Sequence, residues 1–206
     1  MIRIERRESK WIFPFIEYSP TKKTEKMPLI VQLHGAGERG NGKEDLNRVD
    51  VYGFSKTIAD KEIPCIFVMP QCSVETFWVA KIESIIAFIE QVIKEYDVDT
   101  NKIYLTGLSM GGYGTWFTAM ARPDMFSAIA PVCGGGMAWN ASVLKMPIWT
   151  FHGDCDDLVS VNQTDEMVEK LKSLGVDVKY TRLKGVGHGA WFHTYDEELL
   201  NWLLSH

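Results

Sequence analysis

The sequence lacks several features that would place it in a specialised class of protein. Its four cysteines are scattered and form no C-x-x-C pair, which argues against a disulfide framework and a zinc site. No apolar run approaches the roughly 18 residues of a membrane span, and the charged amino terminus is not followed by the apolar segment of a secretory signal. The net charge of −5 argues against a nucleic-acid surface, which would be basic. We therefore expect an ordinary globular protein, located in the cytoplasm.

The length of 206 residues predicts a single compact domain over residues 1–206. No internal repeat, low-complexity tract or linker divides the chain. Apolar runs of strand length recur at 29–33, 66–69, 103–106, 128–132, 148–151 and 178–183. They do not alternate strictly between apolar and polar residues, which is typical of parallel strands covered on both faces. Residues 1–6 and the aromatic stretch 10–18, joined by a short polar turn, predict an antiparallel hairpin.

Helical patterns fill the gaps between the predicted strands. Apolar residues at helical spacing indicate helices over 84–96, 109–121, 163–174 and 195–204, and a weaker helix over 45–60. Gly175 is well suited to end the third of these helices, and the polar stretch 21–26 is expected to be a solvated turn. This alternation predicts an α/β domain with a mostly parallel, doubly wound sheet, to which the hairpin adds antiparallel strands at one edge.

The segment Gly107-Leu108-Ser109-Met110-Gly111 carries the strongest signal for chemistry. It places a serine between a predicted strand and a predicted helix, in the G-x-S-x-G pattern of a nucleophile elbow. Glycine is needed on either side because a Cβ two residues from the serine would collide with a neighbouring strand or helix. The bare pattern also fits a glycine-rich loop, since a chain of this length shows it by chance roughly one time in fifteen. The interpretation therefore depends on partners for Ser109.

A serine hydroxyl is a poor nucleophile and needs a base to take its proton. His188 lies between glycines in the loop after strand 178–183, and we expect it to be this base. His193, just before the last helix, is the alternative. His34 and His152 each precede a glycine at the end of a strand, where an imidazole more often braces a loop by hydrogen bonds.

The base in turn needs an acid that holds its tautomer. The loop after strand 148–151 contains three carboxyl groups. Asp156 fits the recurrent loop pattern H-G-x-x-D-x-x-V best, and Asp157 and Asp154 are the alternatives. Both loops follow strands, where open α/β sheets place their sites.

Ester or amide chemistry also needs two backbone N–H groups aimed at the charge that develops on the substrate oxygen. Met110 follows the serine at the start of a predicted helix, where the helix dipole favours negative charge. Ala36, in the glycine-rich loop 34–40, is the first candidate for the second donor, and Gly37 is the alternative. This loop does not match the phosphate-binding pattern G-x-x-x-x-G-K-[ST] and supports dinucleotide binding poorly. We therefore predict an oxyanion hole at Ala36 and Met110.

Together these motifs resemble the α/β-hydrolase superfamily, and within it the small carboxylesterase, phospholipase and dienelactone-hydrolase-like branch that includes polymer esterase depolymerases. The segments that carry the resemblance are L-H-G-A-G-E-R-G at 33–40, P-Q-C at 70–72 with Trp78 downstream, G-L-S-M-G-G at 107–112 and H-G-D-C-D at 152–156. In this fold the triad follows the order Ser, acid, His. The resemblance implies Ser109 as nucleophile, Asp156 as acid and His188 as base, with no metal or organic cofactor. True dienelactone hydrolases have a cysteine where this chain has Ser109.

The resemblance also implies the hydrolysis of carboxylic esters through an acyl-serine intermediate, at an open site without a large cap domain. Trp78 and Trp191 are candidate substrate contacts, although Trp191 also fits a half-buried side chain that packs its loop. Glu38 and Arg39 are expected to pair and brace their loop. A serine peptidase, a thioesterase and a non-catalytic binding protein on the same fold are the alternative functions. The expected partner is a small-molecule ester, and a homodimer is compatible with the sequence.

Overall fold

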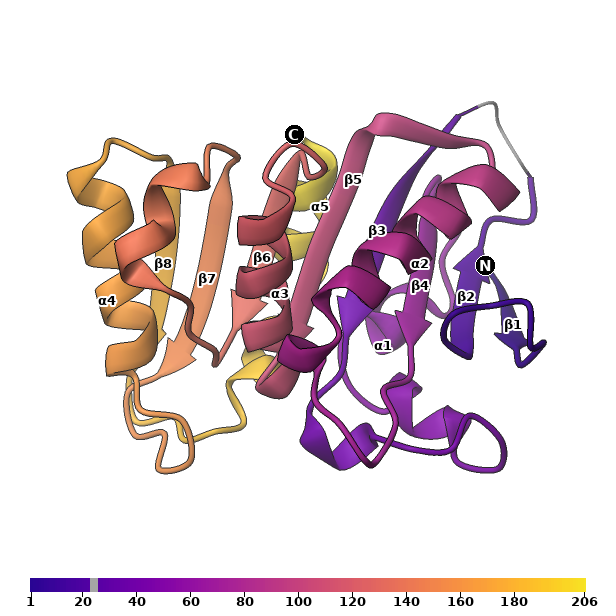
Figure 1. The fold of residues 1–206 in the computed structure, drawn as a ribbon, viewed down its shortest axis with the longest axis horizontal. Coiled ribbons are helices and arrows are strands. Elements are labelled where there is room, and N and C mark those ends of the chain that lie inside the picture. Colours follow the sequence, from indigo (N-terminus) through magenta and orange to yellow (C-terminus); the bar gives the residue numbers. More distant parts are fainter. Residues whose placement is uncertain (23–25) are drawn as a thin grey trace.

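The computed structural model describes residues 1–22 and 26–206, which form a single eight-stranded sheet covered by helices (Figure 1). The strand order is β1-β2-β4-β3-β5-β6-β7-β8. The strands are β1 (Ile2–Arg6), β2 (Phe15–Ser19), β3 (Met27–Leu33), β4 (Ile66–Pro70), β5 (Val98–Leu108), β6 (Ala128–Val132), β7 (Ile148–Gly153) and β8 (Val178–Leu183). Strands β3 to β8 are parallel, whereas β2 pairs antiparallel with β4 and β1 antiparallel with β2. The predicted α/β class and the antiparallel hairpin at one edge are therefore confirmed.

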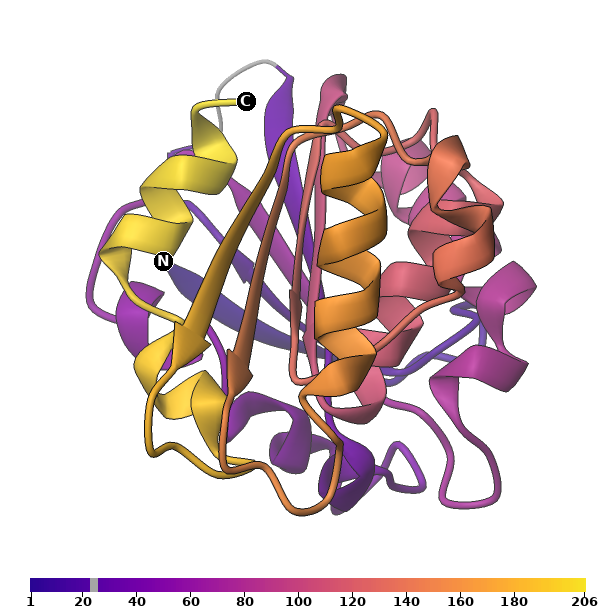
Figure 2. The ribbon, with the colours of Figure 1, turned by 90° about the vertical axis from the view of Figure 1, so that its left-hand side faces the viewer.

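Helices cover both faces of the sheet (Figure 2). The helices are α1 (Ser55–Ile58), α2 (Ile82–Glu95), α3 (Met110–Ala121), α4 (Asn162–Ser173) and α5 (Glu197–Leu204), and the short 3-10 helices are η1 (Ala36–Glu38), η2 (Leu46–Asp50), η3 (Trp78–Ala80), η4 (Ala138–Val143) and η5 (Ala190–His193). One core lies under α2, α3 and α4, and a second core lies under α1 and α5. The fully buried strands β2, β4, β6 and β7 explain why the apolar runs do not alternate.

The elements match the predicted ones most closely where an apolar pattern is long. Helix α2 buries Ile85, Phe88, Ile89 and Val92 along one side, as its spacing predicts. Gly175 follows α4 with a φ of +70°, the left-handed conformation expected of a glycine that ends a helix. Of the predicted turn 21–26, residues 23–25 lie outside the described residues.

The predicted helix over 45–60 is wrong as a continuous element. It is divided into η2 and α1 by a turn in which Gly53 has a φ of +94°. Buried Gln32 enforces this turn, because its amide donates to Tyr52 O at 2.9 Å and accepts from Phe54 N at 2.8 Å. A Cβ at Gly53 would lie 2.0 Å from Gln32 Nε2. A distant strand therefore overrides a local helical preference.

The carboxyl ends of the parallel strands meet at one edge of the sheet, the lower edge in Figure 1. The loops after β3, β5, β7 and β8 all leave from this edge, so segments far apart in the sequence are brought together there. No helix among residues 1–22 and 26–206 combines the length and the apolarity that crossing a membrane requires.

Candidate active site

Ser109 lies in a sharp turn between β5 and α3. Its φ of +53° and ψ of −116° are unusual for a residue with a side chain, and such a conformation costs about 1–3 kcal/mol. The turn is held by a hydrogen bond from Ser109 N to Val132 O of 2.9 Å. The glycines on either side have the expected steric reason: a Cβ at Gly107 would lie 2.4 Å from Gly111 O, and one at Gly111 would lie 2.0 Å from Leu33 O.

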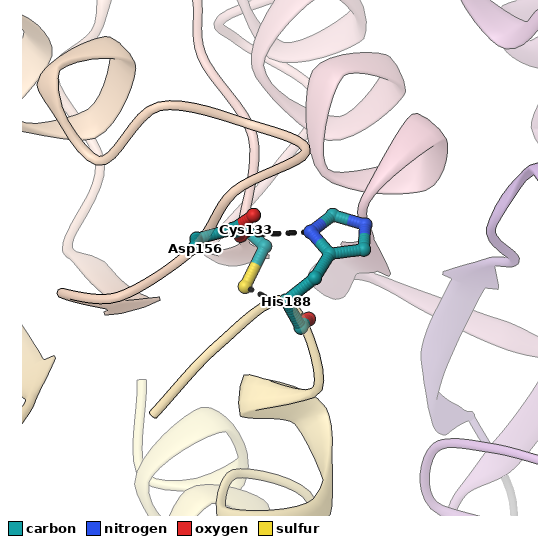
Figure 3. A group of neighbouring side chains, drawn as sticks. All are labelled: Cys133, Asp156 and His188. Carbon is teal, nitrogen blue, oxygen red and sulfur yellow. Dashed lines mark hydrogen bonds and ion pairs between the residues drawn. The ribbon is translucent and has the colours of Figure 1, made fainter. Parts of the chain in front are cut away.

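The structure brings the three predicted triad residues into one hydrogen-bonded chain. Ser109 Oγ lies 2.8 Å from His188 Nε2, and His188 Nδ1 lies 2.7 Å from Asp156 Oδ2. Figure 3 shows the imidazole facing the carboxylate, with His188 on the loop after β8 and Asp156 on the loop after β7. Because the carboxylate can only accept, Nδ1 carries the proton and Nε2 is left to accept from the serine hydroxyl.

The alternatives weighed for the base and the acid lie elsewhere. Asp154 Oδ1 accepts from Gly185 N at 2.7 Å and so caps the loop that carries His188. Asp157 and His193 have exposed side chains and do not line the cavities beside Ser109. The geometry therefore selects Asp156 as the partner of His188.

Asp156 is ionised although its side chain is fully buried. Burial by itself would raise the pKa of this carboxyl, but N–H donors from Val159, His188 and Leu158 outweigh burial and hold the pKa below its usual value. Leu158 N and Val159 N donate to Oδ1 at 3.0 and 2.9 Å, so the loop itself satisfies one carboxylate oxygen. The other oxygen is available for His188.

The two predicted oxyanion donors both begin helical segments. Ala36 is the first residue of η1 and Met110 the first residue of α3, so neither N–H has an acceptor within its own helix. The part of the chain that the structure describes supplies neither of them with another hydrogen-bond acceptor. Ala36 and Met110 each line a cavity that also includes Ser109. Both N–H groups are therefore available beside the serine.

Buried side chains fix the loop that carries Ala36. His34 Nε2 accepts from Cys72 N at 2.9 Å, so Nδ1–H donates to Gly35 O at 2.6 Å. Burial lowers the pKa of His34 to about 4, and the ring is neutral at neutral pH. The expected loop-bracing role of His34 agrees with these contacts.

Trp78 belongs to the same support and does not reach the substrate side. Its side chain is completely buried, and Nε1 donates to His34 O at 2.9 Å. The prediction that Trp78 contacts substrate is therefore wrong, because the indole packs beneath the loop 34–40. The neighbouring Phe77 and Val79, which the sequence reasoning missed, are the exposed side chains of this segment.

Arg39 connects the same loop to the segment 74–77. Its guanidinium donates to Ala36 O at 2.9 Å and to Val74 O and Thr76 O at 3.3 Å each, and it lies 4.6 Å from the centre of the Phe77 ring. The predicted ion pair with Glu38 is wrong, because Arg39 reaches across to backbone carbonyls instead. Only the prediction that Arg39 braces its loop agrees with the structure.

Two cavities meet at Ser109. The smaller, of about 310 Å³, is lined by Ala36, Glu38, Ser109, Leu158, His188 and Trp191 among others. The larger, of about 650 Å³, is lined by Phe77, Val79, Met110, Tyr113, Phe117 and Gln163, together with Ser109 and Gly136. The structure therefore places Trp191 beside the serine, with its ring edge-to-face on His188 at 5.1 Å. No charged side chain lines the larger cavity.

Cys133 lies directly below the Asp156–His188 pair (Figure 3). Its Sγ and the side-chain ligand atoms of that pair fall within 4.8 Å of one another. Burial raises the pKa of the thiol to about 12, and the thiol contacts His188 O at 3.6 Å. The thiol therefore donates to the backbone carbonyl of His188, while the side chains of His188 and Asp156 bond to each other. Cys133 has a φ of +48°, which the sequence reasoning, treating it as a small buried hydrophobe, did not foresee.

The chain is also similar to known proteins. The BD-FAE family profile matches residues 17–129, which is more than half of the chain. The chain belongs to the BD-FAE family. The matched segment includes Ala36 and Ser109 and ends before the loops that carry Asp156 and His188.

Two relatives and two solved structures illustrate the likeness. The chain is 29% identical to the bifunctional acetylxylan esterase/xylanase XynS20E of Neocallimastix patriciarum, over 75% of this chain and 23% of that protein. It is 30% identical to feruloyl esterase B of Talaromyces funiculosus, over 54% of this chain and 33% of that protein. The structure of a thermostable esterase matches with a TM-score of 0.82 and 32% identity, over 99% of this chain and 62% of that chain. Esterase PE8 matches with a TM-score of 0.66 and 22% identity, over 92% and 94%.

These matches show the α/β-hydrolase fold and its esterase branch. The chain spans less than two thirds of the length of XynS20E, feruloyl esterase B and the thermostable esterase. The activities that those names state belong to those proteins.

Proposed function

We propose that this chain hydrolyses carboxylic esters through an acyl-serine intermediate on Ser109. The observation that carries the proposal is the hydrogen-bonded chain from Ser109 Oγ through His188 to buried Asp156, beside two available N–H groups. Relatives named as acetylxylan and feruloyl esterases support the same reaction class. A non-catalytic binding protein would not need a strained serine aligned with a base.

In the first half-reaction, His188 Nε2 takes the proton of Ser109 while Oγ forms a bond to the ester carbonyl carbon. The N–H groups of Ala36 and Met110 donate to the oxygen that becomes negative. His188 then gives its proton to the alcohol oxygen as the bond from carbon to that oxygen breaks. The alcohol leaves, and the acyl group stays on Ser109.

In the second half-reaction, water takes the place of the alcohol. His188 removes a proton from water as the water oxygen attacks the acyl carbon, and the same N–H groups hold the second oxyanion. The bond to Ser109 Oγ breaks, the serine regains its proton from His188, and the carboxylic acid leaves. Asp156 stabilises the imidazolium of His188 in both halves.

The two cavities suggest how an ester lies in the site. The alcohol oxygen must reach His188 to be protonated, so the alcohol would occupy the smaller cavity, beside Trp191 and Glu38. The acyl group would then extend into the larger uncharged cavity, between Phe77 and Phe117. This arrangement favours uncharged acyl groups larger than acetyl, and Trp191 remains a predicted substrate contact.

Substitution of Ser109 tests the proposal. Ser109→Ala is expected to reduce the hydrolysis of a p-nitrophenyl ester by about 10⁴- to 10⁶-fold, because the nucleophile is lost. The wild type should form a covalent adduct on Ser109 with a fluorophosphonate probe, detected by mass spectrometry. Ser205→Ala, at an exposed hydroxyl near the last helix, is the control and should retain full activity. Full activity of Ser109→Ala would refute the proposal.

The same assay addresses the alternative substrates. A series of esters, thioesters and peptide amides with one acyl group would separate an esterase from a thioesterase or a peptidase. A small-molecule ester as partner, a cytoplasmic location and a homodimer stay predictions.

A further inference from the structure

The buried acid of the site contacts two histidines. Asp156 Oδ2 lies 2.7 Å from His188 Nδ1 and 3.2 Å from His152 Nε2. His152 is at the end of β7, four residues before the aspartate, and its side chain is completely buried. It lines neither of the cavities beside Ser109, so it acts on the reaction through the residues that it contacts, Asp156 and Val159.

The contacts of His152 determine where its protons lie. Nε2 faces two acceptors, Val159 O at 2.9 Å and the Asp156 carboxylate, so Nε2 carries a proton. Nδ1 lies 2.7 Å from Thr164 Oγ1, which in turn lies 2.7 Å from Gly134 O. The ring is thus contacted at both nitrogens: Nε2–H donates to Val159 O and lies within 3.2 Å of Asp156 Oδ2, and the single Thr164 hydroxyl proton is shared between Nδ1 and Gly134 O.

The charged and titratable groups around this ring come from four segments. Asp156 lies on the loop after β7, and His188 lies on the loop after β8. Arg182 is the β8 neighbour of His152 in register, and it is paired with Asp165 of α4 at 3.1 Å. Burial lowers the pKa of His152, so the ring is neutral at neutral pH, with its proton on Nε2.

We propose that His152 is a positioning residue, whose Nε2–H orients the Asp156 carboxylate and shares its Oδ2 with His188. Asp156 Oδ1 accepts from Leu158 N and Val159 N, and Oδ2 accepts from His188 Nδ1. The Nε2–H of His152, which also donates to Val159 O, is the fourth N–H beside the carboxylate, 3.2 Å from Oδ2. Rotation of the carboxylate would break contacts of both its oxygens, Oδ1 and Oδ2. The carboxylate oxygen that faces His188 is thereby held in place, and part of its negative charge is directed to a second donor.

Two consequences for the reaction follow, and both depend on the proposed function. Without the second donor, the carboxylate is less well oriented, so kcat falls while KM stays the same, since His152 does not line the cavities. The charge on Oδ2 is then directed at His188 alone, so His188 binds its proton more tightly. The acid limb of the pH profile of kcat/KM therefore moves to higher pH.

A matched pair of substitutions tests the proposal. His152→Leu removes the donor, and it is expected to reduce kcat about 10- to 100-fold because an N–H bond to a buried carboxylate is lost. His152→Gln can place an amide N–H near the position of Nε2 without a titrating ring. It is expected to recover most of kcat and to return the acid limb toward that of the wild type. Active enzyme is counted by fluorophosphonate labelling, and the fold is checked by thermal unfolding.

Two results would overturn the proposal. One is a leucine variant whose kcat and pH profile equal those of the wild type. The other is an equal loss in the leucine and glutamine variants with no movement of the acid limb, which a purely structural role would give.

Thr164→Val tests the same contact from the opposite nitrogen if the leucine variant does not fold. Loss of the hydroxyl frees the ring, and kcat is expected to fall several-fold at constant KM; an unchanged kcat would overturn the proposal. In all of these assays, wild-type labelling at Ser109 separates the two ideas. If the wild type is not labelled, the proposed function fails, whatever the His152 variants do.

Discussion

The two halves of the site are held in place by different means. On the side of β3 and β5, which we call the backbone half, the backbone at Ala36 and Ser109 is held by close glycine contacts and by side chains that bond to carbonyl oxygens. On the side of β7 and β8, the position of His188 depends on bonds between side chains that converge on buried Asp156. The first half is therefore sensitive mainly to shape, and the second mainly to the identity of each donor and acceptor.

The largest expected effect on kcat comes from the side-chain half, which is the side of β7 and β8 with Asp156, His188 and His152. Asp156→Asn replaces an acceptor with an amide and destabilises the tautomer of His188 that serves as base, so kcat is expected to fall about 10⁴-fold. Asp154→Asn is the matched control in the same loop. It changes the acceptor of Gly185 N and Cys155 Sγ but not the contacts of Asp156, and kcat is expected to change less than about threefold. Steady-state kinetics of both variants check this, and equal losses would contradict the role of Asp156.

A smaller effect is expected when the backbone half is loosened. Arg39→Met keeps the length of the side chain and removes the bonds to the carbonyls of Ala36, Val74 and Thr76. Because the oxyanion donor is then held less firmly, kcat is expected to fall about tenfold. Arg122→Met, at an exposed arginine paired with Glu90 and Asp124, is the control and should keep the kcat of the wild type. Equal kcat values for the wild type and Arg39→Met would show that the glycine contacts alone hold this half.

The difference between the backbone half and the side-chain half also explains which parts of the fold and the site could be predicted from the sequence. The strand-to-helix turn at Ser109 is encoded locally by its glycines, and strands β6 and β8 have the predicted bounds. The order of the loops along the chain indicates which loops carry the acid and the base, because parallel strands bring their carboxyl ends to one edge. Within those loops, the pattern H-G-x-x-D-x-x-V favours Asp156 and the flanking glycines favour His188, with Asp157, Asp154 and His193 left as alternatives.

Contacts between different loops could not be predicted from the sequence pattern. Trp78 was mistaken for a substrate contact because nothing local shows that its ring lies under His34. The pairing of Arg39 with carbonyls and the thiol of Cys133 below the acid and base also arise only in the folded chain. The pattern H-G-x-x-D was recognised, but the contact of His152 with the acid depends on the conformation of its loop.

The last expected effect concerns stability rather than kcat, and it separates the two halves by pH. Burial lowers the pKa of His34 to about 4, below its ordinary value of 6.5, so the folded chain keeps the ring neutral where the unfolded chain is protonated. The unfolded chain thus binds more protons between these values, and the stability that is present above pH 6.5 is lost as the pH falls toward 4. The loss due to this ring is at most about 3 kcal/mol.

Urea unfolding of the wild type and of His34→Gln, measured between pH 7 and pH 4.5, checks this prediction. The variant is expected to be less stable at neutral pH, because the bond from Cys72 N to the ring is lost, and to show a flatter dependence on pH. His206→Gln, at the exposed last residue, should keep the slope of the wild type. If the slope of His34→Gln also equals that of the wild type, the acid sensitivity comes from the side-chain half, where burial also lowers the pKa of His152. The half that contains the loop 34–40 would then be the more acid-resistant half of the site.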